Sequence, residues 1–479
     1  MVQPRSGVSG VSRKQQLLKR HRRNKRLGLL LGLLVLLGVG VGVHWWLPLV
    51  LLPLLWVAHE AWFADHLFYS PAEDYQYTFP EGCEPVAVSL VGQALRVTQP
   101  LPVTGDETLI LQVRLKCTWL GRFFDPAVEV LGGDVPDLQT FERGVRGMRY
   151  LNLTGQAAAV MAGNLRLRGR HCRVLDASQL WVVRSGDLHP RRVMVIAPHA
   201  DDAELAAYGL YSKAAESWIV TLTAGEIEAE HYQQMGLERA EAARLKGRLR
   251  AWDSIAVPRW AGVPQAQCVQ LGYFCLQLPA MQAAPDQPMA SREAEMADTR
   301  LFRQFNSLAL PGDHDGAPTW NNLLADLRAL IVLARPQVLV MPHPTLDPHP
   351  DHVCAQAAVL EALQGLEWQP ETLLCYANHL HDNDRWPMGD SGAGVALPPQ
   401  MEAGQGWTPH SLVLDLNAQR DKAMALGMMH DLQPAPPFKR RLRRLLQRWL
   451  AGRKASPYGE NEFFRKAVRR HELFWRRDL

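Results

Sequence analysis

The longest apolar stretch of the chain lies near its N-terminus. From Leu27 to Ala58 every residue is apolar or glycine apart from His44. A buried helix of a soluble protein would not run this far without a charge, and the stretch is too long for a signal peptide, so we expect a membrane segment at 27–63. One straight helix of this length would span about 48 Å, against about 30 Å of hydrocarbon core. A hairpin of two short spans that turns near His44, or one tilted span, therefore fits.

Residues 71–190 show the alternation that is typical of β-strands. Apolar and polar positions alternate through Thr108–Cys117 and again through Leu165–Arg168. Turn signals such as Thr104–Asp106 and Gly132–Asp134 separate these runs. We expect a β-sandwich-like accessory module at 71–190, in which no catalytic pattern is visible.

The pattern changes at residue 191 to short apolar strands that alternate with amphipathic helices. Val193–Ala197 and Trp218–Thr223 read as buried parallel strands. Apolar residues then recur at helical spacing before the strand Val338–Met341, namely Leu323, Leu327, Leu330 and Ala334. This alternation predicts an α/β fold with a doubly wound, mainly parallel sheet over 191–479, which places ligands at the carboxyl ends of its strands.

The distribution of charge is more informative than its total. The 52 Lys and Arg nearly balance the 48 Asp and Glu, but residues 1–26 hold nine bases and residues 439–454 hold eight, with no acid in either segment. The rest of the chain is therefore acidic, which argues against nucleic acid and for an anionic membrane surface as a partner. The 1–26 segment is expected to be a basic cytoplasmic tail. Arg440–Leu450 has the pattern of a basic amphipathic helix, which either contacts the membrane surface or packs on the fold as a solvated helix.

Two clusters of candidate ligands follow predicted strands. The first strand runs into the sequence PHADDAE, which contains His199, Asp201 and Asp202, and a later strand runs into HPTLDPHPDH at residues 343–352. Because the carboxyl ends of parallel strands meet at one edge of a sheet, the two clusters can converge. Imidazole and carboxylate groups with an open position are the donors of a catalytic zinc site, whereas the alternative is a loop in which Asp202 only caps the following helix.

These two motifs resemble the signatures of the PIG-L/LmbE family of zinc-dependent de-N-acetylases, over roughly residues 191–475. The resemblance implies that His199, Asp202 and His352 hold a zinc ion, with Fe²⁺ as the other candidate. His343 and Asp347 lie beside the second motif, and there a role in the turn or behind a ligand is favoured over direct ligation.

The resemblance also implies roles for three further residues. Asp201 would be the general base, His349 would stabilise the oxyanion as an imidazolium, and Asp351 would orient His349 or tune its charge. Three departures from the family pattern are visible: Ala200 replaces a proline, the arginine-acid motif of the family is replaced near Arg248–Asp253, and its Asp-Gly substrate loop is not evident around Leu271–Leu278. The resemblance therefore supports the reaction chemistry of the family more strongly than it supports the identity of the substrate.

The expected function is metal-dependent removal of the N-acetyl group from an N-acetylhexosamine in a glycan or glycolipid, for instance a lipopolysaccharide-core intermediate. A catalytically silent carbohydrate-binding membrane scaffold and an amidase of a non-sugar acylated molecule are the alternatives.

The seven cysteines are odd in number and lack CxxC spacing, which favours a reduced body over a Cys83–Cys117 disulfide. We therefore expect a bacterial inner-membrane protein whose catalytic domain faces the cytoplasm. The oligomeric state is not indicated by the sequence.

Overall fold

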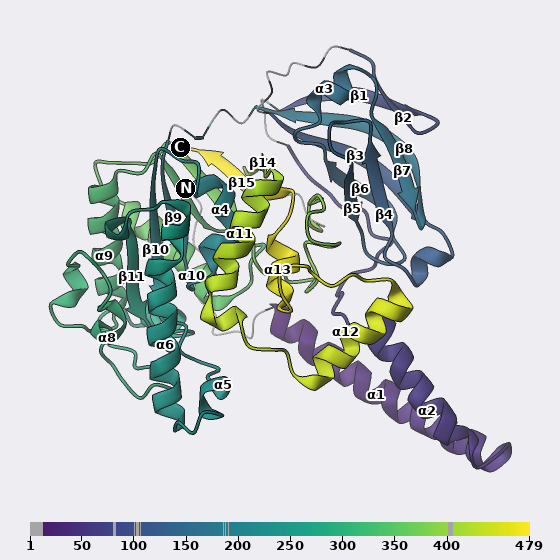
Figure 1. Cartoon of the computed structure of the whole chain (residues 1–479), viewed down its shortest axis with the longest axis horizontal. Coiled ribbons are helices and arrows are strands. Elements are labelled where there is room, and N and C mark those ends of the chain that lie inside the picture. The colour runs from purple at the N-terminus through teal and green to yellow at the C-terminus, as the bar shows by residue number, and fades with distance from the viewer. Residues whose placement is uncertain are drawn as a thin grey trace.

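The computed structural model describes residues 13–79, 83–99, 101, 105, 107–184, 186, 188–189, 191–400 and 406–479. Three parts are visible in Figure 1: a pair of helices that projects from the body, an antiparallel β-rich part, and an α/β part. A long C-terminal arm, which contains helix α12 (Phe438–Ala451), runs between the body and the projecting helices.

The projecting helices form a hairpin. Helix α1 (Arg13–Gly42) and helix α2 (Leu47–Ala58) lie side by side, and a turn of π-helix, η1 (His59–Phe63), follows α2. The break falls where the sequence predicts it, around His44. By length and composition, Gln16–Gly42 is the one described helix that could cross a membrane, and Leu47–Phe63 is a shorter apolar helix. Residues 13–26 of the expected tail are part of α1, whereas residues 1–12 lie outside the described residues.

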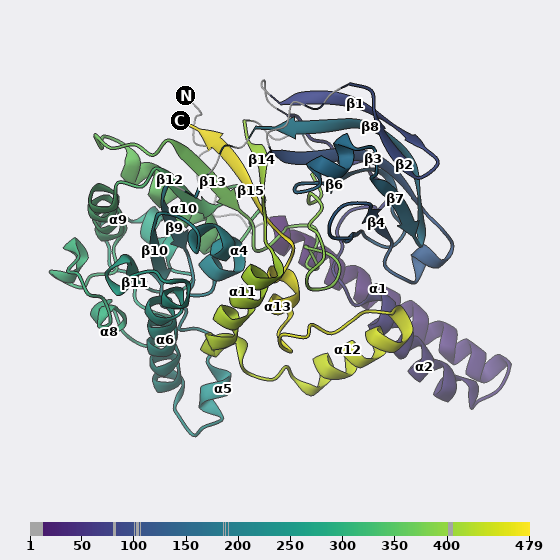
Figure 2. The same ribbon diagram turned by 45° about the horizontal axis from the view of Figure 1, so that its top comes forward.

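The β-rich part is one curled antiparallel sheet. Its strands are hydrogen-bonded in the order β5-β4-β7-β2-β1-β8-β3-β6. Leu109, Leu111, Val113 and Leu115 all point from β3 into a core that this sheet encloses, and each is 0% exposed. The expected sandwich is thus a single continuous sheet that folds over its own core (Figure 2). The elements are β1 (Glu84–Val91), β2 (Ala94–Val97), β3 (Thr108–Cys117), β4 (Ala127–Leu131), β5 (Asp137–Thr140), β6 (Arg146–Asn152), α3 (Ala157–Met161), β7 (Arg166–Arg170) and β8 (Cys172–Val183).

The α/β part is built on a seven-stranded sheet of order β11-β10-β9-β12-β13-β15-β14. The five strands from β11 to β13 are parallel, and β15 is antiparallel to both of its neighbours. The strands are β9 (Arg192–Ala197), β10 (Glu216–Thr223), β11 (Cys268–Tyr273), β12 (Val338–Pro342), β13 (Thr372–Tyr376), β14 (Thr408–Val413) and β15 (His471–Asp478). The helices of this part include α4 (Asp202–Tyr211), α6 (Arg239–Ala256), α9 (Trp320–Ala334), α10 (Pro350–Leu363), α11 (Leu416–Met428) and α13 (Glu462–Ala467).

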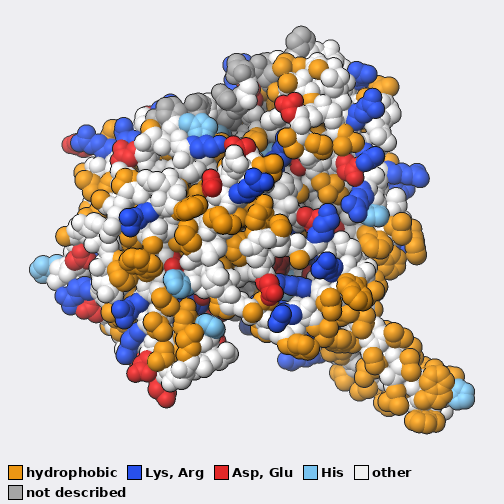
Figure 3. All heavy atoms as spheres, in the orientation of Figure 1, with side chains coloured by type: hydrophobic (Ala, Val, Ile, Leu, Met, Phe, Trp, Pro, Cys, Tyr) orange, Lys and Arg blue, Asp and Glu red, His pale blue; other side chains and the backbone are white. Residues whose placement is uncertain are grey.

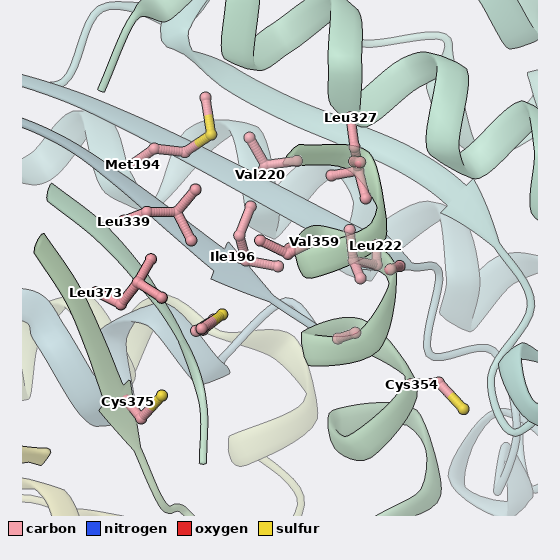
Figure 4. Packing of buried hydrophobic residues seen from close by; sticks show 14 of the residues in the cluster. Met194, Ile196, Val220, Leu222, Leu327, Leu339, Cys354, Val359, Leu373 and Cys375 are labelled. Atoms are coloured by element: carbon pink, nitrogen blue, oxygen red, sulfur yellow. The ribbon is translucent and has the colours of Figure 1, made fainter. Parts of the chain in front are cut away.

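Both faces of this sheet are covered, as expected for a doubly wound fold. Successive residues of a strand point to opposite faces, so Met194 and Ile196 of β9 pack in one core while Val193 and Val195 pack in another. Figure 4 shows the first of these cores, where side chains of β9, β10, β12 and β13 meet those of α9 and α10. Helices α4 and α11 contribute to the second core. Because these strands are buried and mainly apolar, the charged side chains of the fold lie largely in the loops and helices at their ends.

Helix α12 is held against the base of the hairpin. The guanidinium of Arg443 pairs with the carboxylate of Glu60 in η1, and the Gln447 amide donates to the Glu60 carbonyl oxygen at 3.3 Å. Its other side is apolar and exposed: the Phe438 and Trp449 side chains, eleven residues apart in sequence and hence on one helix face, are 79% and 78% exposed. The predicted amphipathic helix is thus present, and its polar face points toward the protein.

Candidate metal and catalytic site

The two predicted clusters meet at one edge of the α/β sheet. The chain leaves β9 at Ala197, passes through His199 and begins α4 at Asp202; it leaves the neighbouring strand β12 at Pro342 and begins α10 at Pro350. Because β9 and β12 are adjacent and parallel, both loops lie at the same end of the sheet. Asp202 also fixes the first turn, since its Oδ2 accepts a hydrogen bond from the His199 backbone N–H at 2.9 Å.

Three donor atoms of these loops converge on one point. His199 Nδ1 and Asp202 Oδ2 are 3.1 Å apart, His352 Nε2 and Asp202 Oδ2 are 3.1 Å apart, and the two imidazole nitrogens are 3.3 Å apart. Ligand bonds of about 2.0–2.1 Å in tetrahedral geometry place donor atoms about 3.3 Å from one another, so these distances fit a small divalent ion. Burial alone would lower the pKa of His352, but the carboxylates of Asp202 and Asp347 raise it to about 10. The same negative potential would attract a metal cation.

Each of the two imidazoles has a carboxylate next to the ring nitrogen that faces away from the candidate metal position. Asp347 Oδ2 lies 2.9 Å from His352 Nδ1 and also accepts from the backbone N–H of Asn378 at 2.9 Å. Asp351 Oδ2 lies 3.2 Å from His199 Nε2. Such partners fix the tautomer and the orientation of a histidine ligand and raise its basicity. The expected role of Asp347 behind a ligand therefore has a geometric basis.

The position of Asp351 differs from the expectation. Its carboxylate contacts His199, accepts from the Leu276 backbone N–H at 2.8 Å and lies 3.5 Å from the Cys275 thiol, so its hydrogen bonds do not run to the His349 ring. The reason is local: His349 caps α10 by accepting from the Asp351 backbone N–H at 3.3 Å, which directs the Asp351 side chain across the site toward the loop after β11. The carboxylate of Asp351 thus contacts the ring of His199, while its charge still acts on His349 by raising the pKa of that ring against the larger effect of burial.

His349 nevertheless lies next to the candidate metal position. Its ring is edge-on to that of His199, with centroids 4.9 Å apart. Burial and then the nearby His199 and His352 imidazoles lower the pKa of His349 to about 3. This environment disfavours the imidazolium that the family resemblance implies. Because Nδ1 accepts the hydrogen bond from the backbone N–H, the neutral ring carries its proton on Nε2.

Asp201 is paired with an arginine that the sequence analysis did not identify. Arg250 of α6 donates from Nη2 to Asp201 Oδ1 at 3.0 Å, and its other terminal nitrogen donates to Asp431. Burial opposes the charge of Arg250, yet the carboxylates of Asp201 and Asp431 raise its pKa above the usual value. Arg250 lies within the Arg248–Asp253 segment where the family motif is replaced. Its place in that segment is the feature of the sequence that could have identified it as a site residue.

Other donor sets in the same place are less suited to an ion. The nitrogen of His349 lies within 4.8 Å of those of His199 and His352, and Cys275 lies within the same limit of His199 and Asp351. Burial raises the pKa of the Cys275 thiol to about 11, so it is a protonated donor to Asp351 at neutral pH. All seven cysteines are free thiols.

A comparison with known protein families identifies the part of the chain that carries this site. The PIG-L family, described as GlcNAc-PI de-N-acetylase, matches residues 194–363, which carry both histidine clusters and Arg250. No curated protein matches the chain. A solved structure of GalB, the 4-carboxy-2-hydroxymuconate hydratase from Pseudomonas putida KT2440, is 14% identical and covers 54% of this chain and 84% of that chain with a TM-score of 0.31, which is too low to bear on function. PIG-L proteins are de-N-acetylase hydrolases, and the domain at residues 194–363 of this chain belongs to the PIG-L family.

Proposed function

We propose that this protein is a metal-dependent N-deacetylase that acts on an N-acetylhexosamine in a glycan or glycolipid at a membrane. The observation that carries the proposal is the convergence of His199 Nδ1, Asp202 Oδ2 and His352 Nε2 within 3.1–3.3 Å of one another beside Asp201. These three residues would hold Zn²⁺ or Fe²⁺, since two imidazoles and one carboxylate suit a transition metal better than Mg²⁺. When bound, such an ion supplies Lewis-acid polarisation and lowers the pKa of water.

Asp201 is the general base in this proposal. Its Oδ1 accepts a hydrogen bond from Arg250 Nη2 at 3.0 Å, which fixes the direction of the carboxylate. The attacking water would give its proton to Asp201, and the same carboxyl group would return that proton to the leaving amine. Amide hydrolysis needs both transfers because an amine leaves poorly as an anion.

His349 would act as a neutral hydrogen-bond donor. With its Nδ1 occupied by the backbone N–H of Asp351, its Nε2–H is available to the carbonyl oxygen of the amide. A fixed donor at that position stabilises the negative charge that develops on the oxygen. The charged form is therefore not needed for the role that we assign to this residue.

The membrane placement is also part of the proposal. It is supported by the apolar hairpin α1–α2 and by the exposed Phe438 and Trp449 of α12 at its base. A helix with such a face can lie in the interface of a bilayer while its polar side stays on the protein. We propose a bacterial inner membrane with the catalytic domain on the cytoplasmic side, where a lipopolysaccharide-core intermediate is a suitable substrate.

Acetate release is the direct test of the activity. The purified full chain, loaded with Zn²⁺ or Fe²⁺, is incubated with N-acetylglucosamine-containing glycolipids and, separately, with N-acylated amino acids. Release of acetate from the glycolipids, lost in Asp201→Asn, supports the proposal. Hydrolysis of the acyl amino acids alone would favour the non-sugar amidase, and binding of glycolipid without any release would favour the silent scaffold.

Reporter fusions at residue 70 test the placement. A cytoplasmic reporter signal is expected if α1 and α2 both cross the membrane, because the chain then returns to the side of its basic N-terminal segment. A signal only from the periplasm would mean one crossing and would move the substrate to an exported glycan.

A further inference from the structure

A cavity of about 1160 Å³ lies between α12, the loops of the β-rich part and the chain that leads from α11 to α13. It is somewhat larger than the roughly 300–1,000 Å³ that is common for small-molecule sites. Its lining includes Arg440, Arg444 and Arg448, which are four residues apart and hence follow one side of α12. Figure 3 shows Lys and Arg side chains gathered above the base of the hairpin.

The positive charge of this cavity is not neutralised by its own carboxylates. Each of the seven carboxylates in its lining has a basic side chain within 4.0 Å. Among the described residues, no carboxylate pairs with Arg440, Arg444 or Arg448, and Arg444 donates only to the Glu460 carbonyl oxygen. Three guanidinium groups on one wall form a site for an anion with several acceptor oxygens.

The cavity reaches the edge of the catalytic site. Asp431, in its lining, is hydrogen-bonded to Arg250, which holds Asp201. Phe463, also in its lining, lies edge-on to His379 with ring centroids 6.4 Å apart, and the His379 ring is 5.2 Å from that of His352. A ligand that extends from the arginines can therefore place another of its groups near the candidate metal position.

The site lies outside the part of the chain that matches the PIG-L family. Its arginines belong to α12, beyond residue 363, and its lining also includes Arg170 and His171 of the β-rich part. The exposed Phe438 and Trp449 are absent from the lining, so α12 presents its arginines to the cavity and its aromatic side chains to the surroundings.

We propose that this cavity binds a phosphate group carried by the amino-sugar substrate, through Arg440, Arg444 and Arg448, and so directs the N-acetyl group to the metal site. This inference rests on the proposed function for the identity of the sugar. The binding of phosphate itself does not depend on hydrolysis and can be measured without it.

The test compares two sugars that differ by one phosphate. Binding of N-acetylglucosamine 1-phosphate and of N-acetylglucosamine to the full-length protein in detergent is measured by calorimetry, with the Asp201→Asn background to prevent turnover. We expect the phosphorylated sugar to bind at least about tenfold more tightly, because its phosphate gains charge-assisted hydrogen bonds from the arginines. The double variant Arg440→Gln/Arg448→Gln should lose this preference, and since both side chains are exposed it should fold.

The matched control removes two charges outside the cavity. Lys439 on α12 and Arg420 on α11 are exposed and absent from the lining, so Lys439→Gln/Arg420→Gln should keep the preference. Equal affinity of the wild type for the two sugars, an unchanged preference in Arg440→Gln/Arg448→Gln, or an equal loss in the control would each overturn the proposal. Failure to release acetate in the wild type would instead count against the proposed function only.

Vesicles distinguish a substrate phosphate from a lipid headgroup. Phosphatidylglycerol vesicles should not displace N-acetylglucosamine 1-phosphate any better than phosphatidylcholine vesicles do. Displacement by phosphatidylglycerol alone, abolished in Arg440→Gln/Arg448→Gln, would show that the cavity takes the headgroup of a bulk lipid and would overturn the substrate assignment.

Discussion

Buried charge occurs in both halves of the molecule, in the antiparallel sheet around Arg149 and at the edge of the parallel sheet around His352. The Arg149 side chain is 0% exposed and pairs with Glu142. Its remaining N–H groups donate to the carbonyl oxygens of Pro71, Glu73 and Met148 at 2.6–2.9 Å. Every donor of this guanidinium has an acceptor within the protein, as burial of a charge requires.

The cluster around His352 is satisfied in a different way. Each outer atom has a partner: Asp347 faces His352 Nδ1, Asp351 faces His199 Nε2, and Asn378 donates to Asp202 Oδ1 at 2.8 Å. The inner atoms instead point at one another. In the Arg149 cluster every hydrogen-bonding group has a protein partner, as expected of a cluster with a structural role. In the His352 cluster the lone pairs of three donor atoms converge and leave a position for a cation, as expected of a functional site.

The substitution with the largest expected effect is His352→Ala. It removes one of three converging donors, so the purified chain should fall from about one divalent ion to nearly none and lose acetate release. Metal analysis by mass spectrometry measures this. The matched control is His231→Ala, which removes an exposed histidine of the short helix Glu230–Gln233. Full metal content in His352→Ala would end the assignment of this residue as a ligand.

Asp201→Asn should separate catalysis from metal binding. The amide cannot accept a proton, so kcat should fall by about 10²–10⁴ while metal content stays unchanged. Asp431→Asn, which removes the other carboxylate on Arg250, should cause a smaller loss. If Asp201→Asn emptied the metal site, the roles of Asp201 and Asp202 would be exchanged.

Arg149→Met tests the other side of the comparison. Loss of one partner leaves the Glu142 charge buried and unpaired, which should cost about 3–5 kcal/mol of unfolding free energy and lower the thermal midpoint. Metal content per folded chain should not change. The control Arg146→Met replaces an exposed arginine of the same strand. A large loss of metal with normal stability would contradict the structural role of this cluster.

The carboxylates behind the histidines should have the smallest of these effects. Asp347→Asn and Asp351→Asn each leave the three ligand atoms in place but weaken the orientation of one imidazole, so metal affinity should fall by about 10–100-fold. Competition with a chelator measures the change. If Asp351→Asn affected only kcat, its contact with His199 would matter less than a role near the substrate.

Much of the fold and of the site could be predicted from the sequence because the relevant signals are local. The strands β9 and β10 and the helix α9 follow from apolar periodicity, and the loops after β9 and β12 carry the donors within a few residues of each strand end. The contact of Asp351 with His199 could not be predicted, because 152 residues separate the two and the direction of the side chain depends on how α10 begins. The pairing of Arg250 with Asp201 has the same character.

The sequence by itself determined which segments are apolar enough for a membrane, which strands are buried, and which residues could ligate a metal, since each of these depends on composition and spacing over a short window. Only the tertiary structure decided which face of α12 meets the protein, which carboxylate stands behind which histidine, and that the β-rich strands form one curled sheet. These features depend on pairwise contacts between distant segments. Spacing along the chain does not specify them, because hydrogen bonds and ion pairs form with whatever partner the packing of the whole chain brings within about 3 Å.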